Sequence, residues 1–253
     1  MRIASLSPAV TEILFALELQ DLIVCTDQFS NFPEEAIDIP HLKDHIDINP
    51  QKLYEHEADL IFTATVIQEK LADRLKAADF SVVHHDPRTI NAIYEMIRNV
   101  GVMLHVESKA AALVLEMQQG FNDVKKKSGL LPRRLKVYIE EWHNPPFASG
   151  NWVPEVARVA GIDQFPIEQG ALSPEVTLAQ VQEWDPDLIV LSPCGAGLHT
   201  EKELITARPQ WDALRAVQEN HVRVIDDSLL NRPGPRLIEG ARRLYGWAFE
   251  FQH

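Results

Sequence analysis

The residues best suited to bind a ligand lie in a short loop rich in arginine and proline. The loop reads Asn231-Arg-Pro-Gly-Pro-Arg236, between an apolar, strand-like run at 222–225 and a segment of helical periodicity at 237–249. Its two prolines fix φ and lack an N–H donor, and its glycine permits a turn that other residues resist. We expect a rigid strand-to-helix loop, the place where open α/β sheets bind ligands. The alternative is a stiff connector with two solvated arginines.

The two arginines of this loop are expected to act differently. Arg232 precedes a proline, which favours extended backbone, so its guanidinium is expected to reach a ligand. Arg236 enters the next helix, and we expect it to tie the loop to the body of the protein through Glu155 or Asp226.

A second candidate binding loop follows the strand-like run 135–139 and is dense in aromatic and polar residues. Trp142, Phe147 and Trp152 are expected to form an apolar wall for a flat or bulky ligand, or else to pack beneath a proline-rich turn. Glu155 follows an expected N-cap at Asn151. Its carboxylate suits the helix dipole, or it faces an arginine or the ligand.

The third candidate is the glycine-rich loop 193–197, which follows the apolar run 188–191. Its glycines allow a close approach of ligand, and Cys194 is expected to line the pocket. A nucleophilic cysteine would need a base, for which His143 and His199 are the candidates. An enzyme that uses Glu141, Glu155 and Cys194 is therefore the catalytic alternative.

A metal site is the least favoured of these readings. His84, His85 and Asp86 offer suitable ligand types after a strand, but adjacent strand residues point to opposite faces. The sequence has no HExxH or CxxC pattern and no phosphate-binding or dinucleotide-binding glycine motif. We therefore predict no catalytic residues, no metal ligands and no certain cofactor.

Composition narrows the class of protein. The chain has 253 residues, of which 45% are hydrophobic and 24% charged, enough for two lobes with buried sheets. A net charge of -13 argues against nucleic acid and anionic membranes as partners. Lys125 to Lys127 and the arginines at 133 and 134 form one basic cluster, interpreted as a solvated helix end. No apolar run is long enough to span a membrane. No export signal is visible, which predicts a cytoplasmic protein, or a periplasmic one if a signal has been trimmed.

Short apolar runs alternate with helical periodicity along the chain, which predicts parallel sheets covered by helices. The expected strands are 3–7, 22–26, 60–63, 81–84, 135–139, 188–191 and 222–225. The expected helices are 8–19, 90–104, 108–127, 153–160 and 174–184. Ser173 is the expected N-cap of the last of these, and Gly161 the expected C′ residue of the one before it.

Two segments resemble the cobalamin-type substrate-binding proteins of ABC importers, the class with a helical backbone. These segments are Arg2-Ile-Ala-Ser-Leu-Ser-Pro-Ala-Val-Thr-Glu-Ile-Leu14 and Arg232 to Arg236, with Thr26-Asp27 and Pro33 between them. Three further matches resemble a subgroup of these proteins that lacks an export signal. They are Gly150 to Glu155, Pro193 to Gly195 and Asn231. The resemblance implies an α/β fold with two Rossmann-like lobes, 1–105 and 131–253, joined by a backbone helix at 106–130.

The same resemblance implies a non-catalytic protein that holds a small or medium-sized organic ligand between the lobes. Cobalamin or another corrinoid is the first candidate ligand, and a metal, haem or iron chelate is the alternative. If the protein is exported, an ABC importer is the implied partner. The resemblance and the positions of the expected strand ends together predict the ligand contacts. These are Ser7, Pro8, Asp27, Thr65, Glu141, Trp142, Phe147, Trp152, Glu155, Cys194, Gly195 and Arg232.

The two cysteines give the first testable prediction. Cys25 and Cys194 fall in different expected lobes, beside apolar runs, so both are predicted to be buried and to stay reduced. Mass spectrometry of the non-reduced protein should find two free thiols. A peptide pair linked through Cys25 and Cys194 would contradict the assignment.

Overall fold

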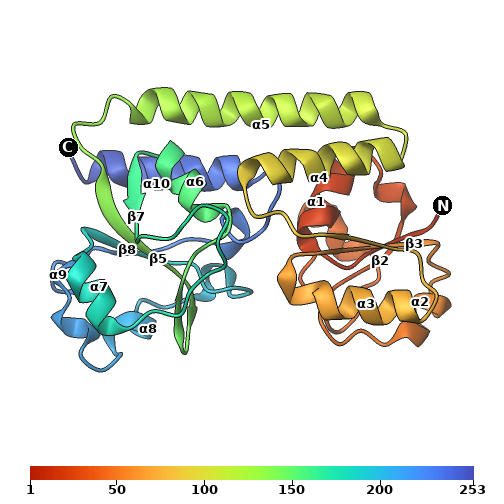
Figure 1. The fold of residues 1–253 in the computed structure, drawn as a ribbon, viewed down its shortest axis with the longest axis horizontal. Coiled ribbons are helices and arrows are strands. Elements are labelled where there is room, and N and C mark those ends of the chain that lie inside the picture. Colours follow the sequence, from red (N-terminus) through yellow and green to blue (C-terminus); the bar gives the residue numbers. More distant parts are fainter. The chain divides into compact units, whose positions relative to one another are not determined.

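A computed structural model describes all residues, 1–253, and they divide into two compact units. Residues 1–87 and 91–115 form the first unit, and residues 88–90 and 116–253 form the second. Figure 1 shows the helices and strands of both units. The predicted α/β class is confirmed.

The first unit contains one parallel sheet of four strands in the order β2-β1-β3-β4. The strands are β1 (Ile3–Ser5), β2 (Ile23–Thr26), β3 (Leu60–Ala64) and β4 (Val82–His85). Each lies at one of the four apolar runs expected for this lobe. Because all four run in the same direction, their carboxyl ends meet at one edge of the sheet.

Helices cover both faces of this sheet. Helices α2 (Pro50–Glu55) and α3 (Glu69–Ala77) pack on one face, where their leucines meet Leu6, Cys25 and Ile61 of the sheet. On the opposite face lie α1 (Pro8–Ala16) and α4 (Ile90–Met103). Three short 3₁₀ turns connect the elements: η1 (Gln20–Leu22), η2 (Glu34–Asp38) and η3 (Val66–Gln68).

Helix α1 is shorter than the periodicity predicted. Apolar residues continue to Leu19, but Glu18 has φ of +58° and the helix ends at Ala16. A left-handed residue cannot continue a right-handed helix, so the turn at Glu18 outweighs the apolar pattern.

Helix α5 (Glu107–Ser128) is the long helix predicted at 108–127. The boundary between the two units falls inside it, at Leu115 and Glu116. Its last turn carries Lys125, Lys126 and Lys127, where positive charge suits the carboxyl end of the helix dipole. No helix of the protein is long and apolar enough to cross a membrane.

The second unit contains a five-stranded sheet that is mainly parallel. Its strands are β5 (Leu135–His143), β6 (Pro146–Ala148), β7 (Ile162–Gln164), β8 (Leu188–Leu191) and β9 (Val222–Val224). Strand β5 is central: β8 lies along one side, and β7 and β6 share the other. The prediction ended β5 at Ile139, but antiparallel pairing with β6 extends it to His143. The strands β6 and β7 were not predicted.

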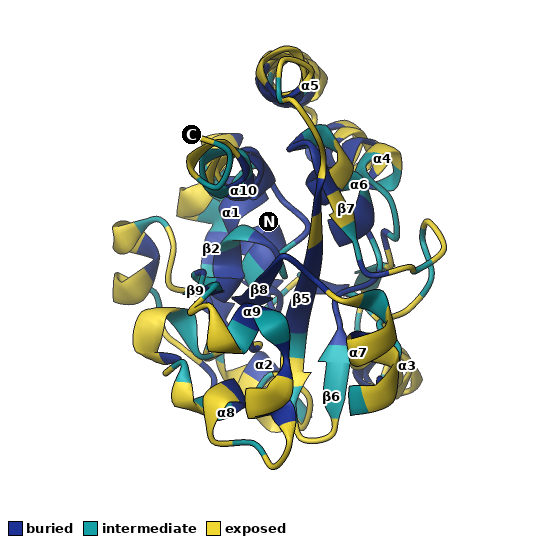
Figure 2. Ribbon diagram, turned by 90° about the vertical axis from the view of Figure 1, so that its left-hand side faces the viewer, coloured by how far each residue is buried: buried dark blue, intermediate teal, exposed yellow.

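Helices also cover both faces of the second sheet (Figure 1), and β8 and most of β5 are buried between them (Figure 2). On one face lie α6 (Val153–Val159) and α10 (Leu237–Glu250), and on the other α7 (Leu178–Trp184), α8 (Glu203–Thr206) and α9 (Arg215–Gln218). Three 3₁₀ turns complete the unit: η4 (Gly197–His199), η5 (Trp211–Ala213) and η6 (Asp227–Leu229).

Two of the predicted helix caps are wrong and one is confirmed. Thr177, not Ser173, caps α7 through a capping box with Gln180. Asn151 has φ of +54°, in the left-handed region, and its side chain does not cap α6. Gly161 has φ of +79° and its N–H donates to the carbonyl of Arg158, as a C′ glycine does.

A buried ion pair fixes the carboxyl half of β5. Glu140 is 2% exposed, and its two carboxylate oxygens accept hydrogen bonds of 2.7 and 2.9 Å from Arg208. The hydroxyl of Tyr138 donates to the same carboxylate at 2.9 Å. The guanidinium of Arg208 also stacks over Trp211, 4.3 Å from the ring centre. The segment before η5 is thereby tied to the strand that leads into the aromatic loop.

Removing one partner of this pair should destabilise the protein strongly, since an unpaired buried charge remains. Arg208→Ala is expected to lower the free energy of unfolding by about 3–5 kcal/mol, measured by urea denaturation. Lys52→Ala, which breaks an exposed pair with Glu55, is the matched control and should cost only ~0–1 kcal/mol. Equal losses in the two variants would contradict the assignment.

Candidate functional site

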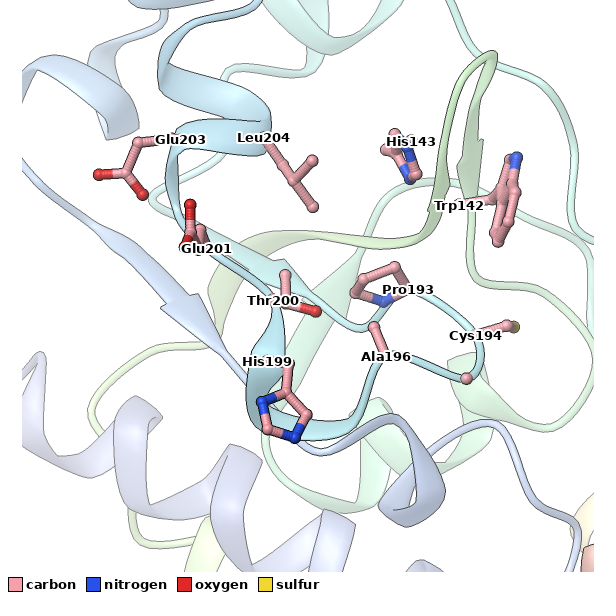
Figure 3. Close-up of a pocket in the computed structure, with 11 residues that line it drawn as sticks. Trp142, His143, Pro193, Cys194, Ala196, His199, Thr200, Glu201, Glu203 and Leu204 are labelled. Atoms are coloured by element: carbon pink, nitrogen blue, oxygen red, sulfur yellow. The ribbon is translucent and has the colours of Figure 1, made fainter. Parts of the chain in front are cut away.

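A cavity of about 560 Å³ opens at the carboxyl end of the second sheet (Figure 3). Its wall comes from the end of β5, from the loop after β8 and from the segment that leads into α8. The residues lining it are Trp142, His143, Pro193, Cys194, Gly195, Ala196, His199, Thr200, Glu201, Glu203 and Leu204. Three predicted site residues, Trp142, Cys194 and Gly195, therefore meet at one cavity.

Trp142 gives the cavity an exposed aromatic face. The residue is 42% exposed, and its indole N–H donates to the carbonyl of Asn144 at 3.1 Å. Its ring lies 5.2 Å from the ring of His143. This anchored but exposed indole is suited to stacking against an apolar ligand.

A buried carboxylate holds the loop after β8 in position. Asp227 is 7% exposed and accepts hydrogen bonds from the backbone N–H groups of Gly195 at 2.8 Å and Gly197 at 2.7 Å. Both glycines have positive φ, +78° and +54°, which side chains resist. The N–H of Cys194 donates to the carbonyl of Glu141 at 3.0 Å, which joins this loop to β5.

The arginine-rich loop reaches the cavity wall through its asparagine. The side-chain amide of Asn231 donates to the carbonyl of Ser192 at 2.7 Å and lies 3.2 Å from the sulfur of Cys194. Sequence reasoning noted Asn231 as part of a motif but missed both its role and that of Asp227. The signal available for Asp227 was its place in the loop that follows β9, the last strand of the sheet.

The arginines of that loop follow the prediction only in part. Arg236 donates to the hydroxyl of Ser228 at 3.0 Å, and this hydroxyl donates to Asp226 at 2.6 Å. The tie to Asp226 therefore runs through Ser228, and the direct pairing expected with Glu155 is wrong. Arg232 is partly buried, and its contact with ligand stays a prediction.

Glu155 is occupied by neighbours in the second unit. Its carboxylate accepts the backbone N–H of Ile90 at 2.6 Å and the side-chain amide of Gln169. Both oxygens are therefore engaged, which favours a structural role over the expected arginine pairing.

Two of the three predicted aromatic residues lie away from the cavity wall. Trp152 is 4% exposed and its indole N–H donates to the carbonyl of Leu230 at 2.7 Å, so the ring belongs to the interior. The alternative of loop packing fits it better than the ligand wall. Phe147 is partly buried in β6, where it pairs with Trp142 across the hairpin.

Cys194 is exposed, so the prediction that both cysteines are buried is wrong for it and right for Cys25. The residue as a whole is exposed, but its sulfur is packed against neighbouring atoms. This packing, and then the carboxylates of Glu141 and Asp227, raise the pKa of its thiol to about 12, and a hydrogen bond with Asn231 lowers it in part. A thiol with this pKa is protonated at neutral pH, which argues against a nucleophile.

Glu141 lies beside this thiol and is partly buried. Burial raises the pKa of its carboxyl to about 7, and a hydrogen bond with Ser173 lowers it in part. Its protonation therefore changes near neutral pH, next to the cavity loop.

The predicted residues of the first unit also lie at strand ends. Ser7 and Pro8 follow β1, Asp27 follows β2 directly and Thr65 follows β3 directly. Thr65 has φ of +67°, a strained conformation for a β-branched residue, and its N–H donates to the carbonyl of His85 at 2.7 Å. Their contact with ligand stays a prediction.

A buried hydroxyl network holds Asp27. Ser30 donates to its carboxylate at 2.5 Å, and Thr11 lies 2.8 Å from Ser30 and 2.8 Å from Ser5, oxygen to oxygen. The chain of hydroxyls links the helix α1 to the ends of β1 and β2.

His84 and His85 are the last two residues of β4 and contact residues of the neighbouring strand β3. His84 lies 2.9 Å from the hydroxyl of Thr63, and the ring of His85 is stacked near Phe62. Burial lowers the pKa of both imidazoles. No group of three or more His, Cys, Asp or Glu side chains that could hold a metal ion occurs in the protein.

The family model described as "Periplasmic binding protein" matches residues 3–229. The chain belongs to this family. We therefore interpret the cavity as a feature of a periplasmic binding protein, together with the loop 193–197 that Asp227 holds and the exposed indole of Trp142.

Named relatives cover almost the whole of this binding protein. An uncharacterized ABC transporter substrate-binding lipoprotein, YvrC of Bacillus subtilis, is 27% identical over 96% of this chain and 78% of its own length. A vitamin B12-binding protein of Vibrio cholerae is 26% identical over 96% of this chain and 87% of its own. The apo structure of the periplasmic heme-binding protein RhuT from Roseiflexus has a TM-score of 0.85 and 18% identity, covering 100% and 99% of the two chains.

The raised pKa of Glu141 predicts a pH dependence of stability. An unfolded glutamate titrates near ~4.3, so between that pH and about 7 the folded protein holds a proton that the unfolded chain has lost. Stability contributed at this site therefore falls as pH rises through this window, by up to about 4 kcal/mol. Glu141→Gln should remove this loss.

Urea denaturation at pH 5 and pH 8 measures the effect. We expect Glu141→Gln to gain stability relative to wild type at pH 8 and not at pH 5, whereas Glu183→Gln, an exposed control, should follow wild type at both. Parallel changes in all three proteins would show that Glu141 titrates normally.

Proposed function

We propose that this chain is a non-catalytic binding protein that holds a small or medium-sized organic ligand. The observation that carries the proposal is the cavity of about 560 Å³ beside Trp142, whose loop wall is fixed by Asp227 and Asn231. Its volume lies within the ~300–1,000 Å³ typical of small-molecule sites. An exposed indole and a preorganised loop suit binding, since a rigid site loses little entropy when it is occupied.

Cobalamin or another corrinoid is the first ligand proposed. A curated relative that this chain covers almost completely is named a vitamin B12-binding protein. The cavity combines apolar faces, from Trp142, Pro193 and Leu204, with polar groups that can accept or donate hydrogen bonds. A large ring with polar substituents needs this combination.

Haem or another metal chelate is the second candidate. His143 and His199 both line the cavity, and an imidazole is a common axial ligand of iron. The buried Nδ1 of His143 has no hydrogen-bond partner within the protein. The heme-binding neighbour RhuT shares the fold.

The enzymatic alternative is disfavoured by the chemistry of its own residues. A cysteine nucleophile reacts as the thiolate, and a thiol pKa of about 12 leaves almost none at neutral pH. Glu155, the second residue of that alternative, has both carboxylate oxygens engaged by Ile90 and Gln169.

An ABC importer is the partner proposed, because the relative YvrC is named an ABC transporter substrate-binding lipoprotein. The cytoplasmic location expected from the sequence stays a prediction. Fractionation of the native host, with an antibody against this chain, decides between cytoplasm and envelope.

The experiment that tests the proposed function starts from the purified protein. Mass spectrometry and absorption spectra of the native protein identify any retained ligand, and calorimetric titration with cyanocobalamin and with hemin compares the two classes. Saturable binding of one compound at a ratio near one to one supports the proposal. Turnover of a compound by the wild type, lost in Cys194→Ser, would overturn it in favour of an enzyme.

Truncating the exposed indole should weaken ligand binding with little change in stability. We expect Trp142→Ala to raise the Kd for the bound compound at least about tenfold, since aromatic anchors in a binding site contribute ~2 kcal/mol or more. Phe249→Ala removes an aromatic residue of similar exposure on α10, outside the cavity, and should leave the Kd unchanged. An unchanged Kd for Trp142→Ala would place the ligand elsewhere.

A further inference from the structure

A second cavity of about 560 Å³ lies at the opposite, amino-terminal edge of the second sheet. Its walls come from the carboxyl ends of α5 and α6 and from the segment that leads into β5. The lining residues are Lys125, Ser128, Gly129, Leu131, Pro132, Arg133, Arg134, Arg158 and Val159. Four of these nine side chains carry positive charge, in a protein whose net charge is -13.

Two of the four cations have no anionic partner. Arg133 pairs with Asp187 at 2.7 Å and Arg134 lies 3.6 Å from Asp163. Lys125 and Arg158 form no ion pair within the protein and are exposed. Lys125 lies in the last turn of α5 and Arg158 in the last turn of α6, where the helix dipole favours a cation. The dipole does not explain why these two side chains line the same cavity.

The frame of this cavity is built by hydrogen bonds between the two helix ends. The hydroxyl of Ser128 lies 2.7 Å from the carbonyl oxygen of Val159 and 3.1 Å from that of Lys125. A Cβ on Gly161 would come within 3.0 Å of Ser128 and 2.8 Å of Leu131, so the segments that follow α5 and α6 approach each other closely here. The cationic side chains therefore project from a fixed backbone.

Three carbonyl groups at these helix ends, which would repel an anion, accept hydrogen bonds. The carbonyl of Lys125 accepts the N–H of Gly129, and that of Ser128 accepts the N–H of Leu131. The carbonyl of Arg158 accepts the N–H of Gly161 and lies 3.4 Å from an Nη of Arg134. These hydrogen bonds offset part of the negative potential of the helix ends, and the four cationic side chains add positive charge around the cavity.

We propose that this cavity is a binding site for a phosphate-bearing anion with two or more phosphate groups. Guanidinium groups bind phosphate oxygens through paired hydrogen bonds, and lysine adds a point charge. The cations come from three separate segments around one concavity, a geometry that a compact polyanion satisfies better than a single carboxylate. The site lies at the other edge of the sheet from the cavity beside Trp142, so it is independent of the function proposed above.

Calorimetric titration of the full chain with tripolyphosphate, at low ionic strength, tests the proposal. We expect saturable binding that weakens as salt is added, because exposed charges are screened. The double variant Lys125→Gln/Arg158→Gln should lose at least about tenfold in affinity, since each charge-assisted hydrogen bond contributes about tenfold or more. Lys126→Gln removes the same charge from an adjacent residue that does not line the cavity, and its affinity should stay within about twofold of wild type.

Flotation with vesicles distinguishes the source of the phosphate. Binding of tripolyphosphate without binding to phosphatidylglycerol vesicles assigns the site to a free polyphosphate compound. Vesicle binding that tripolyphosphate competes away, and that the double variant loses, assigns it to lipid headgroups. No binding of either probe, or equal binding by the wild type and the double variant, overturns the proposal. Thermal melts confirm that the variants are folded.

Discussion

The carboxylate of Asp227 is the constraint on which the cavity beside Trp142 depends. A buried charge is costly unless it is hydrogen-bonded, and the N–H groups of Gly195 and Gly197 supply those bonds. The glycines adopt positive φ, which turns both N–H groups toward one carboxylate. The same turn leaves Cys194 at the cavity and its N–H on the carbonyl of Glu141. These hydrogen bonds therefore hold the loop in the conformation that forms the cavity wall.

Strand β5 connects the two chemically different ends of the second unit. Its amino end follows Arg133 and Arg134, and its carboxyl end carries Glu140, buried against Arg208, and then Trp142. Parallel neighbours fix the register along the strand, so neither end can shift without breaking the ladder. The two edges of this sheet therefore present loops of different origin and different charge.

The sequence predicted structural features that depend on neighbouring residues, such as strands and helix ends. It did not predict features that depend on contacts with residues far away in the chain. Apolar runs located seven strands, and Gly161 marked the end of α6, because burial and φ preference act within a few residues. The strands β6 and β7 were missed because each has only three residues and is held extended by its pairing with β5. Trp152 was predicted to contact ligand. The sequence does not show that its indole N–H donates to the carbonyl of Leu230, 78 residues away. Asp227 was missed for the same reason, since its partners lie some thirty residues earlier.

Charge favours the corrinoid over haem at the cavity beside Trp142. Glu201 and Glu203 line its wall and Glu141 lies behind the loop, whereas no lysine or arginine lines it. Haem carries carboxylates, which this wall would repel, and a corrin carries amide groups, which can donate hydrogen bonds to carboxylates. Four cationic side chains of the second unit line the cavity at the other edge of the sheet instead. The carboxylates of Glu201 and Glu203 therefore favour a neutral or hydrogen-bond-donating ligand over an anion at the first cavity.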